Sequence, residues 1–121
     1  MTRKYKKKTI EQKELEKRDK NWANKVKLNF NNKCALCLET KYLNSHHIIP
    51  REIKEFRFWE INGIALCVKC HKFGLNSAHR NPLWFFMQLD KFYKLKIDYL
   101  KKKYAEYLGG HFNVKRRINT N

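Results

Sequence analysis

Apolar side chains recur at intervals of three and four residues after Asn81, a spacing that places them on one face of a helix. The terminal signals agree, because Asn81 is a favourable N-cap and Pro82 suits the first helical position. Two adjacent glycines at 109–110 predict the end. The stripe consists of Phe86, Leu89, Tyr93, Ile97, Leu100, Tyr104 and Leu108. We therefore predict one long helix over residues 81–110, whose stripe packs on the domain as core.

Residues 1–32 carry a much weaker pattern and a dense charge. Thr9 and Gln12 have the spacing of a capping box, which predicts the start of a helix. The apolar positions that could dock this helix on the rest of the chain are sparse: Leu15, Trp22, Val26 and Phe30. This pattern predicts a helical arm of weak amphipathicity.

Between these helices, two short segments read as strands. The first is "LNSHHIIP" at 43–50, and the second is "INGIALC" at 61–67, entered through a turn at Asn62 and Gly63. Together they predict a β-hairpin with a wide loop. Neighbouring residues of a strand point to opposite faces, so His46 and His47 are expected to lie in different environments and to serve different roles.

The predicted fold class is α+β, with a small core flanked by an N-terminal helix and a long C-terminal helix. The expected organisation is a basic helical arm over 1–32, a core over 33–87, the long helix over 81–110 and a basic tail over 111–121. A chain of 121 residues supports one domain of this kind, with a core small enough to benefit from a metal or another cross-link.

Charge points to a polyanionic partner. Lys and Arg number 28 against 11 acidic residues, which gives a formal net charge of +17. Nucleic acid is favoured over an anionic membrane, because the densest apolar run, "LWFFM" at 83–87, is too short to span a bilayer. The start "MTRKYKKKTI" lacks the apolar segment of a secretory signal, so we expect an intracellular, cytoplasmic protein.

The four cysteines form two identical pairs, Cys34 with Cys37 and Cys67 with Cys70, with 29 residues between the pairs. Each C-x-x-C pair can form a tight knuckle, and two knuckles supply the four thiolates of a tetrahedral zinc site. The alternative is four ordinary buried cysteines. A closed four-sulfur site leaves no position for a substrate, so the expected Zn²⁺ is structural.

The order "CALC…SHHIIP…NGIALCVKCH…SAHRNP" resembles the HNH endonucleases, in particular small phage or mobile-element members of that family. The resemblance covers about residues 34–87. It implies a ββα-metal, treble-clef-like core and a hydrolase that cuts or nicks DNA phosphodiester bonds with a divalent metal. It also implies the cytoplasm of a bacterial host, with phage packaging proteins as further partners.

The resemblance also implies roles for individual residues. His47 takes the general-base position, while His46 and His71 take metal-ligand positions. Asn62 matches the central Asn, which fixes the loop in most branches and contacts the metal in others. His79 is open between a third metal ligand and a phosphate or helix-capping contact. A histidine at position 46 makes the site rich in nitrogen, which suits nickel, manganese, cobalt or zinc as well as magnesium.

Basic residues near this predicted site are candidates to hold the DNA backbone: Arg51, Lys54, Arg57 and Arg80. The ends of the chain are also basic, which suggests affinity that is sensitive to salt and independent of sequence. Two other functions stay open, a non-catalytic zinc module that binds nucleic acid and a degenerate nuclease that serves packaging. The oligomeric state is open as well.

Overall fold

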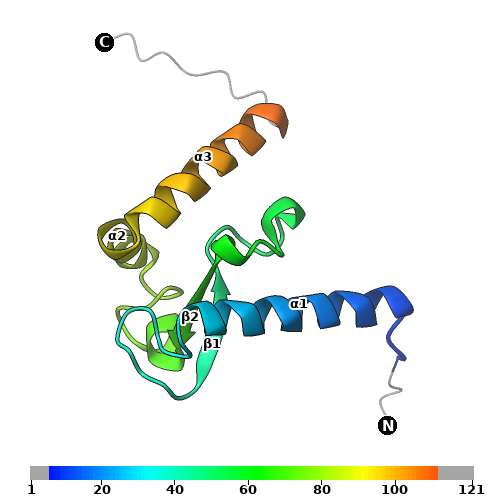
Figure 1. Cartoon of the computed structure of the whole chain (residues 1–121), viewed down its shortest axis with the longest axis horizontal. Helices are drawn as coiled ribbons and strands as arrows, with labels where there is room; N and C mark the ends of the chain where they lie inside the picture. The colour runs from blue at the N-terminus through cyan, green and yellow to red at the C-terminus, as the bar shows by residue number, and fades with distance from the viewer. Residues whose placement is uncertain (1–5, 112–121) are drawn as a thin grey trace.

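The computed structural model describes residues 6–111, and of residues 110 and 111 it describes the backbone alone. It is a mixed α+β structure with a two-stranded sheet (Figure 1). The main elements are α1 (Ile10–Asn29), β1 (Leu43–His47), β2 (Gly63–Cys67), α2 (Pro82–Phe92) and α3 (Lys94–His111). Short helical turns are η1 (Lys54–Phe56), η2 (Glu60–Asn62) and the π-helical η3 (Lys69–Phe73). The predicted tail beyond His111 lies outside the described residues, as do residues 1–5 of the predicted arm.

Both helix starts that the sequence predicts are confirmed. Thr9 and Gln12 form the reciprocal capping box of α1, with each side chain bonded to the backbone N–H of the other. Asn81 caps α2 by accepting a hydrogen bond from the backbone N–H of Trp84 at 3.2 Å, and Pro82 occupies the first turn.

The hairpin is antiparallel, with His46 opposite Ile64 and His47 opposite Gly63. One face of it lies against the C-terminal half of α1 (Figure 1), where the Ser45 hydroxyl donates to the carbonyl of Ala23 at 2.6 Å. The other face carries Ile64 into the main buried cluster. That cluster consists of Cys34, Ile64, Leu66, Cys67, Cys70, Ala78, Phe85, Leu89 and Ile97. The two-stranded sheet is thus covered on both faces, and β2 is buried along its whole length.

The prediction of a single C-terminal helix is wrong. Tyr93 adopts φ −131° and ψ 41°, which ends α2 and separates it from α3. Its hydroxyl donates to the carbonyl of Ala35 at 2.7 Å, so a contact with the first cysteine knuckle holds the residue at this bend. The stripe shifts accordingly: Phe85 is buried and Phe86 is 42% exposed. The helix also continues through the two glycines to His111.

Gly63 allows α1 to lie close to the hairpin. A Cβ at this position would collide with Val26 Cγ2 and would lie 2.8 Å from Trp22 Cζ2. We expect Gly63→Ala to lower the free energy of unfolding by about 1–3 kcal/mol, the usual cost of overpacking. Urea denaturation followed by circular dichroism measures the change.

Gly109→Ala is the matched control, because a Cβ there has no atom within 4 Å and the residue lies in α3. It should raise the stability by about 0.5–1 kcal/mol through helix propensity. Equal midpoints for Gly63→Ala and the wild type would contradict the proposed contact with α1.

Among the helices of residues 6–111, none combines the length and the apolar character that a membrane crossing requires.

Candidate functional site

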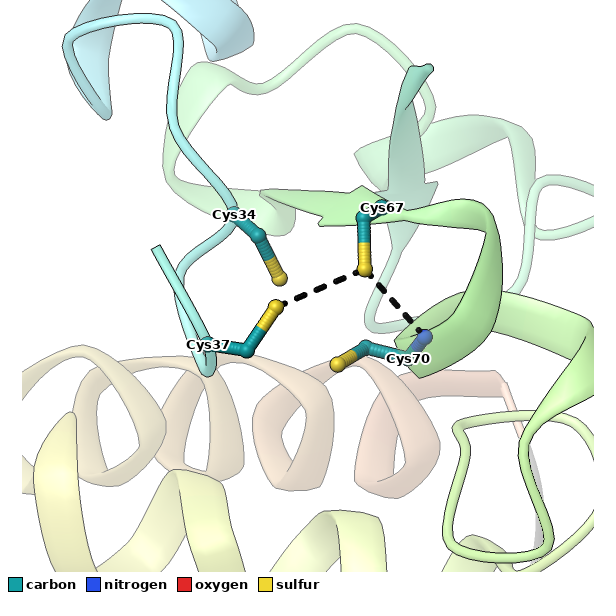
Figure 2. Close-up of side chains that lie close together, drawn as sticks. All are labelled: Cys34, Cys37, Cys67 and Cys70. Atoms are coloured by element: carbon teal, nitrogen blue, oxygen red, sulfur yellow. Dashed lines mark hydrogen bonds between the residues drawn. The ribbon is translucent and has the colours of Figure 1, made fainter. Parts of the chain in front are cut away.

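The four cysteines converge in one cluster, positioned for zinc binding. Their sulfur atoms all lie within 4.8 Å of one another, and none of them is in a disulfide. Figure 2 shows the side chains of Cys34 and Cys37 pointing toward those of Cys67 and Cys70. The Sγ atoms of Cys37 and Cys67 are 3.5 Å apart, close to the separation of about 3.8 Å that Zn–S bonds of 2.3 Å impose in a tetrahedron.

Local hydrogen bonds build the cluster from two turns. The backbone N–H of Leu38 donates to the carbonyl of Cys34 at 3.0 Å, with Leu38 in the left-handed region at φ 66°. The N–H of Ala35 donates to the carbonyl of Ala65 at 2.8 Å, which joins this knuckle to β2. In the second turn, the N–H of Cys70 points to Cys67 Sγ at 3.5 Å (Figure 2). The prediction that both C-x-x-C pairs share one site is confirmed by the positions of the four sulfur atoms.

Three of the predicted site histidines form a second cluster. Nε2 of His71 lies 3.1 Å from Nδ1 of His46 and 2.9 Å from Nε2 of His79, and these atoms lie within 4.8 Å of one another as a set. They come from β1, from η3 and from the loop before α2. Imidazoles bound to zinc at 2.0–2.1 Å hold their nitrogens about 3.3 Å apart, so the spacing fits a metal ion.

Burial keeps two of these rings neutral. It lowers the pKa of His46 to about 3 and the pKa of His71 to about 4, and in each case a neighbouring imidazole adds to the effect. At neutral pH both rings therefore have a nitrogen lone pair available for a cation. His71 Nδ1 is buried and has no hydrogen-bond partner among the described residues. Three nitrogen donors suit zinc, nickel and related ions, and such a set leaves coordination positions open.

These three histidines share a pocket of about 480 Å³ with His47. The charged side chains that also line it are those of Arg51, Lys72 and Glu52, two cations and one carboxylate. Lys72 follows His71 directly in the chain, yet no spacing rule identified it from the sequence.

His47 lies on the other face of β1, as the alternation of a strand predicts. Its ring stacks on Trp22, with centroids 3.8 Å apart and planes inclined by 7°. Nε2 lies 2.9 Å from the carbonyl oxygen of Arg57. Because that oxygen can only accept, Nε2 carries the proton in the neutral ring and Nδ1 retains a lone pair. Burial lowers the pKa of His47, which favours this neutral form.

Asn62 is fully buried and ties down the loop between the strands. Its Oδ1 accepts from the N–H of Ile49 at 2.6 Å, and its Nδ2 donates to the carbonyls of Ile49 and Phe56 at 3.0 and 3.1 Å. The amide is thus engaged with the backbone, which favours the loop-fixing interpretation over a contact with a metal.

The four predicted backbone-binding residues lie in different settings. Arg51 lines the histidine pocket, and Lys54 is exposed in η1. Arg57 is committed to Asp19, with Nε to Oδ1 at 2.9 Å and Nη2 to Oδ2 at 2.5 Å. Arg80 donates from Nη1 to the carbonyl of Phe73 at 3.2 Å. Of these, Arg51 is the residue placed to meet a ligand in the pocket.

The structure therefore brings together His46, His47, His71 and His79, and it keeps the cysteine cluster as a separate site. The sequence did not indicate Asp19 and indicated Trp22 only as part of a docking face; in the structure Trp22 stacks on the His47 ring, and Asp19 pairs with Arg57, whose carbonyl contacts that ring. A comparison of this chain with protein-family models, with curated proteins and with solved structures finds no match in any of the three.

Proposed function

We propose that this protein is a metal-dependent endonuclease that hydrolyses phosphodiester bonds of DNA. The observation that carries the proposal is the convergence of His46, His71 and His79 nitrogens beside His47 in one cationic pocket. A module that only binds nucleic acid needs basic residues and the cysteine cluster, but it has no use for four histidines around one pocket.

The resemblance to HNH endonucleases agrees with this arrangement. We take the hairpin, the helical turn η3 and the cysteine cluster as a treble-clef-like ββα-metal core, with the C-terminal helices packed on it. In this interpretation His71 lies on the helical element that follows the second strand, and the cysteine cluster holds a structural Zn²⁺.

The chemistry divides between the two faces of β1. His46, His71 and His79 would hold the divalent ion, which when bound supplies positive charge to the phosphate and to the departing oxygen. His47 accepts a proton from the attacking water through Nδ1, since Nε2 is engaged by the carbonyl of Arg57. Asn62 keeps the loop that contains this carbonyl in place.

Charge around the pocket supports a nucleic-acid substrate. Arg51 lines both the histidine pocket and an adjoining pocket that is bordered by Lys6, Lys7 and Lys8. The two carboxylates of the second pocket, those of Glu16 and Asp19, are paired with Lys8 and Arg57. A phosphate chain that enters the first pocket can therefore continue along cationic side chains into the second. Contacts of this kind give salt-sensitive binding without base readout. The preference for DNA over RNA rests on the resemblance.

The test is relaxation of supercoiled plasmid by the purified, zinc-loaded protein. Magnesium, manganese, nickel or zinc is added in separate reactions, and EDTA is added in another. We expect metal-dependent nicking that EDTA stops, and a loss of about a hundredfold or more in His47→Ala, the scale of a general base. His111→Ala is the matched control, because this histidine belongs to no predicted motif, and it should nick at the wild-type rate.

Circular dichroism after EDTA treatment separates loss of the catalytic ion from loss of the structural one. A protein that stays folded, shifts DNA on a gel and never cuts it with any of these metals would contradict the enzyme proposal. The chain would then be a zinc-stabilised nucleic-acid-binding module or a packaging accessory.

A further inference from the structure

The helix α1 covers the face of β1 on which His47 lies, and its contacts surround that ring. Trp22 is 4% exposed and stacks face to face on the imidazole. The indole is itself fixed, because its Nε1 donates to the carbonyl of Trp59 at 2.8 Å. A ring held between a buried indole and the hairpin cannot change its tilt without disturbing the packing of α1.

The second support of the His47 ring also leads to α1. Nε2 of His47 is bonded to the main-chain carbonyl of Arg57. The guanidinium of the same residue forms a two-point ion pair with Asp19, and the side chains of this pair are 15% and 28% exposed. One residue earlier on α1, Arg18 lies over the ring of Phe58 at 3.9 Å. The loop is thus attached to α1 through the side chain of Arg57 before this carbonyl and through the side chain of Phe58 after it.

These contacts lie apart from the metal-ligand histidines. His46 faces the opposite side of β1, toward His71, His79 and Phe85. These ring contacts of His46 include neither Asp19 nor Trp22, so we expect a change in either residue to affect the surroundings of His47 first.

We propose that Asp19 and Trp22 are positioning residues for His47, so that α1 sets the orientation of the base in addition to stabilising the fold. Asp19 acts through Arg57, whose carbonyl selects the ring nitrogen that carries the proton. Trp22 acts through the stack, which fixes the plane of the ring. The catalytic part of this inference rests on the proposed function of His47.

The first experiment measures kcat and KM for plasmid nicking by Asp19→Ala. Misplacement of a reacting group costs up to about a hundredfold in rate, so we expect kcat to fall by about tenfold or more with KM unchanged. Glu14→Ala is the matched control, because Glu14 is exposed on the same helix and lines neither the histidine pocket nor the adjoining lysine pocket. It should leave both constants unchanged.

A double mutant tests the route through Arg57. If Asp19 acts through that side chain, Asp19→Ala combined with Arg57→Ala should lose no more kcat than either change alone. A rise in KM with kcat unchanged would overturn the proposal, because it would assign the pair to DNA binding. Losses that multiply in the double mutant would overturn the route through Arg57.

Nuclear magnetic resonance of the His47 ring gives a readout that needs no activity. In the wild type we expect a single tautomer with the proton on Nε2, and ring protons shifted upfield by the Trp22 indole. Asp19→Ala should mix the tautomers, and Trp22→Phe should reduce the upfield shift while keeping an aromatic neighbour. Unchanged signals in both variants would overturn the proposal. The expected signals in a protein that never nicks DNA would support the positioning contacts and contradict the proposed function instead.

Discussion

Removal of zinc is expected to unfold this protein. Cys34, Cys67 and Cys70 are members of the main buried cluster, and the cysteine site joins the knuckle before β1 to the end of β2. Structural zinc binds in small domains with an apparent free energy of about 10–16 kcal/mol. The free energy of unfolding of a domain is only about 5–15 kcal/mol, so the zinc site can account for all of it. Circular dichroism before and after dialysis against a strong chelator measures the effect, and added Zn²⁺ should restore the spectrum.

Cys67→Ser tests the same point without a chelator. The residue is 3% exposed at the end of β2, and a hydroxyl there would replace one of four thiolates. Leu38→Asn is the control, because Leu38 lies in the first knuckle, is 68% exposed and has φ 66°. Asn tolerates the left-handed region, so this variant should keep its zinc and its fold. A chelated protein with an unchanged unfolding midpoint would indicate four ordinary cysteines, three of them buried and Cys37 exposed.

Local signals explain what the sequence predicted correctly. The capping box at Thr9, the N-cap at Asn81 and the two C-x-x-C pairs each depend on residues a few positions apart, whose spacing is legible in the chain. The hairpin followed from two short strand-like segments and the turn residues Asn62 and Gly63. His46 and His47 were expected on opposite faces for the same reason, since the period of a strand is two.

Contacts between distant segments explain what the sequence did not predict. The bend at Tyr93 depends on a hydrogen bond to Ala35, 58 residues away, which no periodicity encodes. The ion pair of Asp19 with Arg57 spans 38 residues. Because α1 carries many charged residues that face solvent, nothing in the sequence distinguished Asp19 from them. Trp22 was expected as part of a docking face, but its partner could not be identified before the hairpin was placed.

The structure excludes one of the alternatives for His79, the helix-capping contact. Asn81 caps α2, so the helix start does not need His79. Its Nε2 lies instead beside His71, in the histidine cluster. Spacing along the chain could not predict this contact, because it depends on how the loop between His71 and His79 folds back and brings the two rings together.

Asn62→Ala is expected to lower the free energy of unfolding by roughly 3–5 kcal/mol. The substitution leaves the buried N–H and carbonyl of Ile49 without a partner and takes one of two donors from the Phe56 carbonyl, which keeps the N–H of Trp59. Each orphaned group costs about 1–3 kcal/mol, partly offset where water enters, and the lost side-chain packing adds to the cost. These groups belong to Ile49 and Phe56, which hold the loop between β1 and β2 closed over its own core. Chemical denaturation in the presence of zinc measures the loss. Asn24→Ala, an exposed change on α1, is the control and should stay within about 0.5 kcal/mol of the wild type.

Asn62→Asp separates the contribution that the shape of this side chain makes to stability from the contribution of its hydrogen bonds. The carboxylate has nearly the same size and can still accept from the N–H of Ile49, but it faces two carbonyl oxygens where the amide donates. A buried acceptor opposite acceptors is unfavourable, so Asp should fail to rescue the stability. Stability equal to the wild type in Asn62→Asp would mean that packing alone requires this residue. Because the Arg57 carbonyl follows Phe56 directly, we expect both variants to disturb the His47 ring as well, which links the closure of the loop to the orientation of the proposed base.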